Sequence, residues 1–504
     1  MSEFIPATTG LSRVFIIDGR AGPENLQEYF SCLRAQAVSQ AFGDITNIEC
    51  PDPTRPGAYV VVGSFQSGEE RATVTLEGRY ALDLRSRLLR MARNKCPVDV
   101  QVHFGDCEDL SDPNSFKKVL FLEDCLLSSY NTEDLGSLSD ADTAAVNESV
   151  EVSAAQIYDI IPHTWAEKAG DLATTEVVAA VVCDEVSCGD CGAPSGGCEK
   201  IFAVTLLAGG SPGTPPDVLY SLDGGITWYA HDIETLGAAM DPNDVACLKG
   251  QLVVVSADYV GAAIADLDDF DEFGTDPDFD GVAAGFVGGH GPTCITKRLA
   301  TRAYIGGEAG YIYLMTTPEN GVTVLEDGAL TISDLRDIDA LSENFVVAVG
   351  NDGVILYSED GETFQLLTTA PVGVGVDLYC VFVKSKLEWW VGGDNGNLYY
   401  TLDGGAHWTQ KEFVGDGAGT VVQDIEFATD SIAYMAHTTA APLGRILCSF
   451  NGGYDWEVMP LGTALMPDAD RFNQVAVCRA DPELVVPVGL AGDGADGIVV
   501  IGTM

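Results

Sequence analysis

Basic side chains are scarce in this chain of 504 residues, which has 26 Lys and Arg against 76 Asp and Glu and a formal net charge of −50. Proteins that hold duplex nucleic acid do so by neutralising phosphates with Lys and Arg, so this balance excludes a general nucleic-acid-binding surface. Solubility and adaptation to high salt are two simple explanations of the acidity. A third is a conduit for DNA, because an acidic wall repels the DNA that passes along it.

Long apolar runs are also missing. No stretch of about 18 uninterrupted apolar residues occurs, and the start Met1-Ser-Glu-Phe lacks the basic and apolar regions of a signal peptide. We therefore expect a soluble protein that is made in a host cytoplasm and does not insert into a membrane.

Motifs of catalysis are missing as well. The six histidines are scattered without the spacing of metal ligands, and no Gly-x-Ser-x-Gly elbow, phosphate loop or zinc-protease motif is present. What the sequence does have is Gly, at 56 residues, which is typical of many short strands joined by tight turns.

Four segments share one pattern, in which a strand ends at an Asp-Gly or Asn-Gly turn and an aromatic residue opens the next strand. They are Tyr220-Ser-Leu-Asp223-Gly-Gly-Ile-Thr-Trp228, Tyr357-Ser-Glu-Asp360-Gly-Glu-Thr-Phe364, Tyr400-Thr-Leu-Asp403-Gly-Gly-Ala-His-Trp408 and Cys448-Ser-Phe-Asn451-Gly-Gly-Tyr-Asp-Trp456.

The spacing of these segments is that of propeller blades. The interval is 43 residues from Tyr357 to Tyr400 and 48 from Tyr400 to Cys448, the length of one four-stranded blade. The 137 residues between Tyr220 and Tyr357 hold two further blades, with equivalent strands near Ala265 and Tyr313. One more period after Cys448 falls near Val499, which brings the number of blades to seven.

The seventh blade lacks its outer strand, because the sequence given ends at Met504. His163-Thr164-Trp165 resembles the tail of a repeat, Ile226-Thr227-Trp228, with no turn before it. We expect a strand near residues 161–169 to complete the last blade, since such closure buries both edges of the ring. The predicted domains are therefore residues 1–160 and a propeller of residues 161–504.

The repeats resemble the Asp boxes of propellers such as sialidases, sortilin-type receptors and the photosystem II assembly factor. The resemblance implies a fold and no particular function. The box residues are predicted to form turns and pack over them, a structural role shared by Asp223, Trp228, Asp360, Phe364, Asp403, Trp408, Asn451 and Trp456.

Catalysis by the propeller is not expected. Sialidases bind an anionic sugar with three converging arginines, and residues 161–504 hold six arginines with no Phe-Arg-Ile-Pro-like segment among them. We predict that the protein is not an enzyme and requires no cofactor. A glycan-binding or sialidase-like propeller protein with an accessory N-terminal domain is the alternative, and loss of sialoside turnover on changing Arg298 or Arg445 would favour it.

Two segments are candidate ion sites. Cys183, Cys188, Cys191 and Cys198 lie within sixteen residues between the first two strands of the first blade, where they suit either a structural zinc ion or two disulfides. Asp276-Pro-Asp278-Phe-Asp280-Gly matches the first half of a calcium loop, but Val287 stands where the last ligand, Glu, would be. A solvated acidic loop is the favoured alternative to calcium.

The first 160 residues differ from the repeats in their pattern of apolar residues. Helical spacing of apolar residues predicts helices in residues 23–40 and 82–92, and strands are expected near Ala58, Ala72, Val98 and Lys118. Pattern alone therefore predicts a small α+β domain with no function attached. The whole chain is predicted to be mainly β, with this α+β part followed by the seven-bladed propeller.

The order of segments in this first part resembles the tail tube protein of long-tailed viruses. The matching runs begin at Gly68-Glu-Glu-Arg, Leu88-Leu-Arg-Met, Gly105-Asp-Cys-Glu and Leu135-Gly-Ser-Leu. The resemblance implies a β-sandwich that forms stacked, hexameric rings and conducts the genome. Residues 1–160 carry 13 basic and 25 acidic side chains, so this part is itself acidic.

A virion structural protein is the first functional hypothesis. The N-terminal domain would polymerise with itself and meet other tail proteins, and viral DNA would pass along its lumen without specific binding. The propeller would be displayed outside for decoration or to bind a cell-surface glycan. A free-standing α+β domain that merely links the propeller to something else is the plainer alternative.

Overall fold

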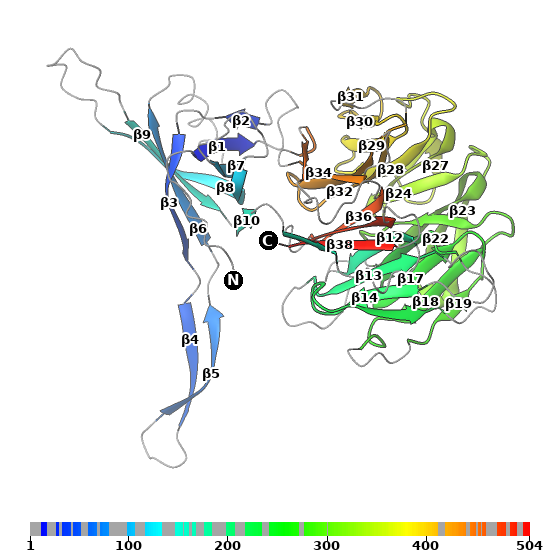
Figure 1. Ribbon diagram of the computed structural model, residues 1–504, viewed down its shortest axis with the longest axis horizontal. Helices are drawn as coiled ribbons and strands as arrows, with labels where there is room; N and C mark the ends of the chain where they lie inside the picture. The colour runs from blue at the N-terminus through cyan, green and yellow to red at the C-terminus, as the bar shows by residue number, and fades with distance from the viewer. Residues whose placement is uncertain are drawn as a thin grey trace. The chain divides into compact units, whose positions relative to one another are not determined.

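A computed structural model describes the backbone of the strands in residues 12–160 and most of the propeller (Figure 1). In the second part, the described residues are 164–167, 176–183, 198–206, 217–233, 241–271, 277–299, 301–411, 419–439, 444–449, 452–454, 456–459, 471–479, 484–490 and 497–503. The chain divides into two compact units, Met1–Pro162 and His163–Met504.

Strands make up the described part of the first unit. One eight-stranded antiparallel sheet has the order β2-β1-β7-β8-β9-β6-β3, and β10 pairs with β8 outside that path. Its strands are β1 (Ser12–Ile17), β2 (Gln27–Tyr29), β3 (Leu33–Ala41), β6 (Arg71–Arg79), β7 (Val98–Gly105), β8 (Phe116–Glu133), β9 (Asn147–Ala154) and β10 (Gln156–Ile160). The side chains of Val74, Val100 and Leu122 are fully buried in it.

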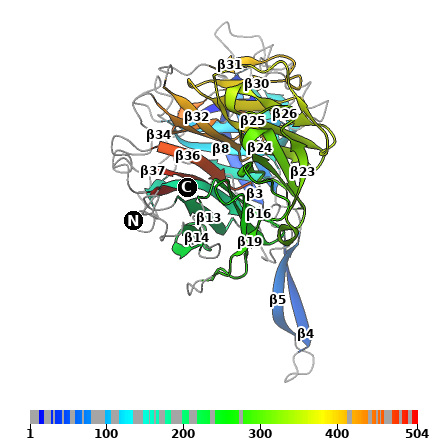
Figure 2. The same cartoon turned by 90° about the vertical axis from the view of Figure 1, so that its right-hand side faces the viewer.

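A two-stranded arm extends from this sheet. Strands β3 and β6 pair up to Ala41 opposite Arg71, and the same hairpin continues as β4 (Asp44–Pro51) and β5 (Tyr59–Ser67), with Asp44 opposite Ser67. Both views show β4 and β5 projecting as a ribbon of their own (Figures 1 and 2). At about 3.4 Å per residue, eight paired residues span roughly 27 Å.

The helix predicted for residues 23–40 is wrong. Strands β2 and β3 lie in this segment, and β3 pairs along its length with β6. The same segment also fits the alternation of apolar and polar residues that is typical of a strand, as in Leu33-Arg-Ala-Gln-Ala-Val. Long-range pairing with a neighbouring strand decides between helix and strand here. The helix predicted for residues 82–92 lies outside the described residues.

Seven four-stranded antiparallel sheets form the second unit, which is a seven-bladed β-propeller. In the first three blades the strands run from the inside outward as β12 (Val177–Cys183), β13 (Lys200–Thr205), β14 (Asp217–Ser221), β15 (Tyr229–Asp232); β16 (Asp244–Leu248), β17 (Gln251–Ser256), β18 (Gly261–Asp266), β19 (Asp280–Val282); and β20 (Pro292–Ile295), β21 (Ala303–Gly307), β22 (Tyr311–Met315), β23 (Val322–Asp327).

The remaining blades repeat this order. They comprise β24 (Leu335–Ser342), β25 (Phe345–Gly350), β26 (Ile355–Ser358), β27 (Phe364–Leu366); β28 (Leu378–Val383), β29 (Trp389–Gly393), β30 (Leu398–Thr401), β31 (Thr409–Lys411); β32 (Val421–Phe427), β33 (Ala433–Thr438), β34 (Gly444–Ser449), β35 (Glu457–Val458); and β36 (Arg471–Val477), β37 (Val485–Leu490), β38 (Gly497–Thr503) with β11 (Thr164–Glu167). Within the described residues, three 3-10 turns lie between strands: η4 (Glu308–Gly310), η5 (Pro318–Asn320) and η6 (Asn351–Gly353).

The hydrophobic core lies between neighbouring blades. The middle strands are buried on both faces, so they are almost continuously apolar, as in Gln251-Leu-Val-Val-Val of β17. Each face packs against the next blade in a separate cluster, and the cluster between the first and last blades joins Ile201 and Leu219 to Val486 and Ile501.

The ring is closed by the strand nearest the N-terminus of the second unit. β11 pairs antiparallel with β38, with Trp165 opposite Gly502, and so occupies the outer position of the seventh sheet. This is the position that the sequence assigned to a closing strand. Gly225, in the first blade, has a φ of +87°, which favours glycine, and a Cβ there would lie 2.6 Å from Cδ1 of Ile501 in the last blade.

Two disulfides hold the first blade to both of its neighbours. Cys183 at the end of β12 is joined to Cys247 in β16, and Cys198 just before β13 is joined to Cys478 just after β36. The pairing differs from that expected, because each partner lies outside the Gly-rich loop. Cys183 and Cys198 are thus not available as zinc ligands in this structure, and Cys188 and Cys191 lie outside the described residues.

Reduction should therefore destabilise the propeller. The two disulfides close chain segments of 64 and 280 residues, and a native disulfide typically stabilises a fold by about 2–4 kcal/mol. Thermal unfolding of the full chain should shift to lower temperature by several degrees on reduction. An unchanged midpoint after complete reduction, verified by thiol counting, would contradict the pairing.

Candidate functional site

The central channel of the propeller is where the inner strands of all seven blades meet. These strands contact their counterparts in neighbouring blades. Six of them have a register shift at the same point, and the shift leaves one residue unpaired in each strand. Bulges of this kind re-aim a side chain, and all six bulged residues line one cavity: Val178, Thr293, Arg336, Tyr379, Gln423 and Asn473.

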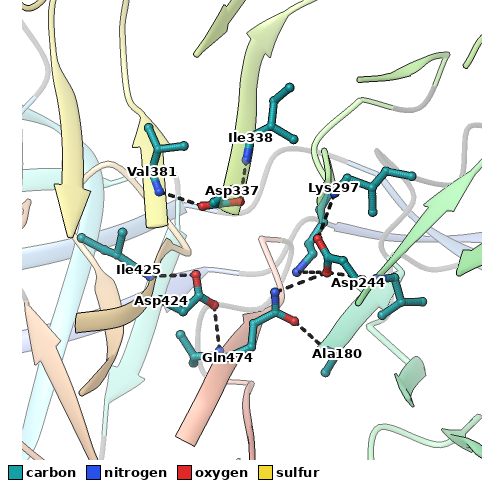
Figure 3. Close-up of polar contacts among 12 residues, drawn as sticks. Ala180, Asp244, Lys297, Asp337, Ile338, Val381, Asp424, Ile425 and Gln474 are labelled. Carbon is teal, nitrogen blue, oxygen red and sulfur yellow. Dashed lines mark hydrogen bonds and ion pairs between the residues drawn. The ribbon is translucent and has the colours of Figure 1, made fainter. Parts of the chain in front are cut away.

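Three inner strands carry an aspartate that joins two blades, and Asp337 and Asp424 directly follow the bulge of their strands. Asp244 accepts hydrogen bonds from the backbone N–H of Val245 at 2.9 Å and from that of Ile295, in the next blade, at 3.0 Å (Figure 3). Because inner strands of different blades do not pair, their N–H groups need acceptors from side chains. The aspartate provides one for its own strand and one for its neighbour.

The same bridge recurs two and four blades further on. Asp337 accepts from Ile338 and Val381, both at 2.7 Å. Asp424 accepts from Ile425 at 2.8 Å and from Val475 at 2.9 Å. We call Asp244, Asp337 and Asp424 the bridging aspartates. In the last blade an amide takes the same place, because Oε1 of Gln474 accepts from the N–H of Ala180 at 2.7 Å.

A buried ammonium group lies among these carboxylates. Lys297, which follows β20, places Nζ 3.1 Å from Oδ1 of Asp244 (Figure 3). The neighbouring carboxylates of Asp424, Glu426 and Asp337 also raise its pKa, against the effect of burial. The charge of Lys297 is therefore kept inside the channel by the aspartates around it.

Two further ion pairs involve the residues two positions after Asp337 and Asp424. Arg298 donates through Nη1 to Oδ2 of Asp339 at 2.8 Å and to the carbonyl of Val383 at 2.8 Å, and its guanidinium lies 4.4 Å from the ring centre of Phe382. Arg479 donates to Oε2 of Glu426 at 3.1 Å. Both guanidinium groups are thus engaged inside the protein.

The channel holds more carboxylates than cations, and burial governs their ionisation. Burial raises the pKa of Asp337 well above its usual range, with the charge of Asp424 as the next cause. Burial also raises the pKa of Asp424 to about 7, although Lys297 opposes the shift. The pKa of Glu426 is raised for the same reason. Proton binding by this group is therefore linked to the stability of the fold.

One cavity of about 350 Å³ opens at the end of the channel where the inner strands begin. We call its rim the mouth. Beside the six bulged residues it is lined by the bridging aspartates and by Asn243, Arg471 and Gln474. Its lining is mostly polar, and a volume of this size lies within the range of small-molecule sites.

The repeated turns lie between the third and fourth strands of their blades. Oδ1 of Asp223 accepts from the N–H groups of Ile226 and Thr227 at 3.0 and 2.8 Å, and Nε1 of Trp228 donates to the carbonyl of Gly225. Asp360 and Asp403 bind the backbone of their own turns in the same way, and these bonds help to lower the pKa of Asp360 to about 2. These aspartates are turn residues with no role at the mouth.

Sequence reasoning missed one participant in each turn. The hydroxyl two residues before the turn aspartate is buried and accepts the N–H of a turn glycine: Ser221 from Gly225, Ser358 from Gly361 and Thr401 from Gly405. Ser449 does the same for Gly453 in the fourth turn, where Asn451 itself lies outside the described residues. The sequence feature that could have identified this hydroxyl is the Ser or Thr that lies two residues before the turn Asp or Asn in all four repeats.

The aromatic residues of the turns pack over them. Phe364 and Trp228 are buried, and Nε1 of Trp456 donates to the carbonyl of Gly453 at 2.7 Å. Trp408 lies with its ring centre 6.4 Å from that of Trp389.

The calcium candidates fall partly on a strand. Asp278 and Asp280 are exposed and alternate with the buried Pro277 and Phe279, and Asp280 is the first residue of β19. This alternation is that of a strand, which directs both carboxylates toward solvent. Asp276 lies outside the described residues, and within the described ranges no group of three or more His, Cys, Asp or Glu is placed to hold a metal ion.

No protein-family model matches the sequence, and neither does any curated protein. Solved structures similar to the chain include YCF48 bound to D1 peptide (14% identity, TM-score 0.49, 69% of this chain and 96% of that one) and YCF48 from Cyanidioschyzon merolae (13%, 0.48, 67% and 98%). The WD40 propeller domain of Doa1 is a third (12%, 0.47, 68% and 98%).

The class of the protein rests on its own strand pairing, because these similarities are weak. Seven four-stranded sheets closed by β11 define a mainly β protein with a seven-bladed propeller. Among the residues that the structure describes, no helix is long and apolar enough to cross a membrane.

The raised pKa of Asp424 predicts a pH-dependent stability. The folded protein holds this proton more tightly than the unfolded chain, so the stabilising contribution is complete below about pH 4, the unfolded pKa, and is lost as the pH rises through about 7. Lys297, Asp337 and Glu426 interact electrostatically with Asp424, and Arg479 acts on Glu426.

Wild-type protein should therefore lose more stability between about pH 5 and pH 8 than Asp424→Asn, which cannot titrate. Denaturant unfolding at several pH values measures the difference. Glu359→Gln, at an exposed turn, removes one carboxylate elsewhere and should keep the wild-type pH profile. Parallel profiles for wild type and Asp424→Asn would contradict the assignment.

Proposed function

We propose that this chain is a virion structural protein whose first unit assembles into rings of a tail tube and whose propeller is a displayed binding module. The observation that carries the proposal is the arm formed by β4 and β5, together with the sheet from which it extends. A subunit of a stacked ring needs strands that pair with neighbours and an extension that reaches the next ring.

The edges of the sheet support this assembly. β3, with nine residues, is the last strand of the described sheet at one end, and β2, with three, is the last at the other. A long edge strand offers unpaired N–H and C=O groups, which a second copy of the chain can pair with. The arm continues directly from this edge strand, so both contacts come from one hairpin.

Charge sets the conditions for assembly. The net charge of −50 makes copies of the chain repel one another, and salt screens that repulsion. An acidic lumen would let viral DNA slide without specific binding, as the tail tube resemblance implies. Other tail proteins are the expected partners at the ends of such a tube, and the tail of the virion is the expected location.

The alternative of a glycan-processing propeller has less support. A sialidase-like site needs several arginines free to bind a carboxylate, and Arg298 and Arg479 are engaged with Asp339 and Glu426 inside the channel. Arg471 pairs with Glu176 at the mouth. A non-catalytic role in display or attachment agrees better with this arrangement.

Assembly should depend on both salt and the arm. The full chain should form rings or tubes that increase as salt rises from about 0.01 to 0.5 M, because screening shortens to a few ångströms. A variant in which a short Gly-Ser turn replaces residues 44–67 should form fewer and shorter tubes. Electron microscopy and light scattering measure the outcome, and thermal unfolding confirms that the propeller is intact.

A full chain that stays monomeric at every salt concentration would contradict the proposal. Equal assembly with and without the arm would contradict the role given to β4 and β5.

A further inference from the structure

The mouth of the channel offers free hydrogen-bonding groups of both kinds. Gln423 has no hydrogen-bond partner among the described residues, and Nη1 and Nη2 of Arg336 have none either, since only its Nε donates, to Asn351. Nε of Arg471, which also lines the mouth, is buried and has no hydrogen-bond partner among the described residues. Arg336 is exposed and Gln423 is half-buried, so both can reach a ligand that enters the cavity, and the unpaired buried Nε of Arg471 departs from the usual pairing of buried polar groups.

Acceptors are present beside these donors. Asn473 uses both bonds of its Nδ2 on Glu176 and Val177, which leaves its Oδ1 as an acceptor at the mouth. Each carboxylate oxygen of Asp337 and Asp424 accepts one backbone N–H and retains a second lone pair. A ligand at this site must therefore donate as well as accept.

The charges at the mouth exclude a strongly charged ligand. An anion would approach Asp244, Asp337 and Asp424, where the raised pKa values of Asp337 and Asp424 already reflect crowded negative charge. A cation would approach Arg336, with Lys297 beneath it. Placing like charges together in a poorly solvated cavity is costly, so a neutral ligand fits this mixture best.

We infer that the mouth binds a neutral, polyhydroxylated ligand, namely a hexose residue. Each sugar hydroxyl both donates and accepts, which matches a rim of amide, guanidinium and carboxylate groups. A cavity of about 350 Å³ is large enough for one such residue. Tyr379, which faces the guanidinium of Arg336 at 6.0 Å, supplies an aromatic surface for the apolar face of the ring.

The roles within the site follow from the contacts already made. Asp337 and Asp424 are held by two backbone N–H groups each, so they are fixed acceptors. Arg336 and Gln423 are the groups with open capacity, and they sit on bulges of different blades. A hexose between them would bridge the fourth and sixth blades. This inference does not depend on tube assembly, because the propeller contains every residue involved.

The test uses the full chain and ligand-observed NMR with methyl glycosides of glucose, galactose, mannose and N-acetylglucosamine. N-acetylneuraminic acid serves as the anionic probe and glucosamine as the cationic one. At least one neutral glycoside should give saturation transfer and a titratable affinity. Gln423→Ala and Arg336→Gln should each weaken that affinity about three- to tenfold, as expected for a lost hydrogen bond.

Gln365→Ala, at an exposed position of β27, is the matched control and should leave the affinity unchanged. The side chain of Gln423 makes no hydrogen bond or ion pair within the described structure, so Gln423→Ala should fold normally. Binding of the anionic or cationic probe alone would overturn the inference. So would the failure of every neutral glycoside, or binding that neither mouth variant weakens.

Discussion

The propeller depends on one constraint, which is that seven inner strands converge on an axis without pairing with one another. Their backbone N–H groups would be left without partners at the channel, and an unsatisfied buried donor is costly. The bridging aspartates solve this for alternate blades, since each carboxylate accepts one N–H from its own strand and one from the next. The blades are thereby joined at the axis as well as through their apolar faces.

This solution places several negative charges in one poorly solvated channel. Lys297, Arg298 and Arg479 balance part of that charge, and the rest appears as raised pKa values of Asp337, Asp424 and Glu426. The strands of Asp337 and Asp424 carry a bulge one residue earlier, which directs Arg336 and Gln423 into the cavity. The polar mouth is therefore a by-product of how the blades are joined, and its chemistry sets what it can bind.

Much of the propeller could be predicted because its signals are local. Asp223, Asp360 and Asp403 form turns through bonds to nearby backbone groups, so the turns can be recognised from local sequence. The spacing of the turns gives the number of blades without knowledge of how the blades pack. The strands near Ala265, Tyr313 and Val499 lie in β18, β22 and β38. Trp165 lies in the outer strand of the last sheet, since an edge left by one strand must be filled by another.

The channel and the disulfides could not be predicted, because both depend on segments far apart in the sequence. Asp337-Ile-Asp339 and Asp424-Ile-Glu426 repeat one pattern, but the role of these acidic residues can be recognised only once the inner strands are known to converge. Cys183 and Cys198 are close in sequence, yet each pairs with a distant cysteine. The helix expected in residues 23–40 was wrong for a related reason, as pairing of β3 with β6 outweighs local periodicity.

Hydrogen exchange at the inner strands is the most direct test of the bridging aspartates. The backbone amides of Ile295, Val381 and Val475 donate to carboxylates of the preceding blade, so their exchange should be as slow as that of the paired middle strands. In Asp424→Ala, exchange at Val475 should speed up while Ile295 stays protected. Fast exchange of all three amides in the wild-type protein would contradict this account of the propeller.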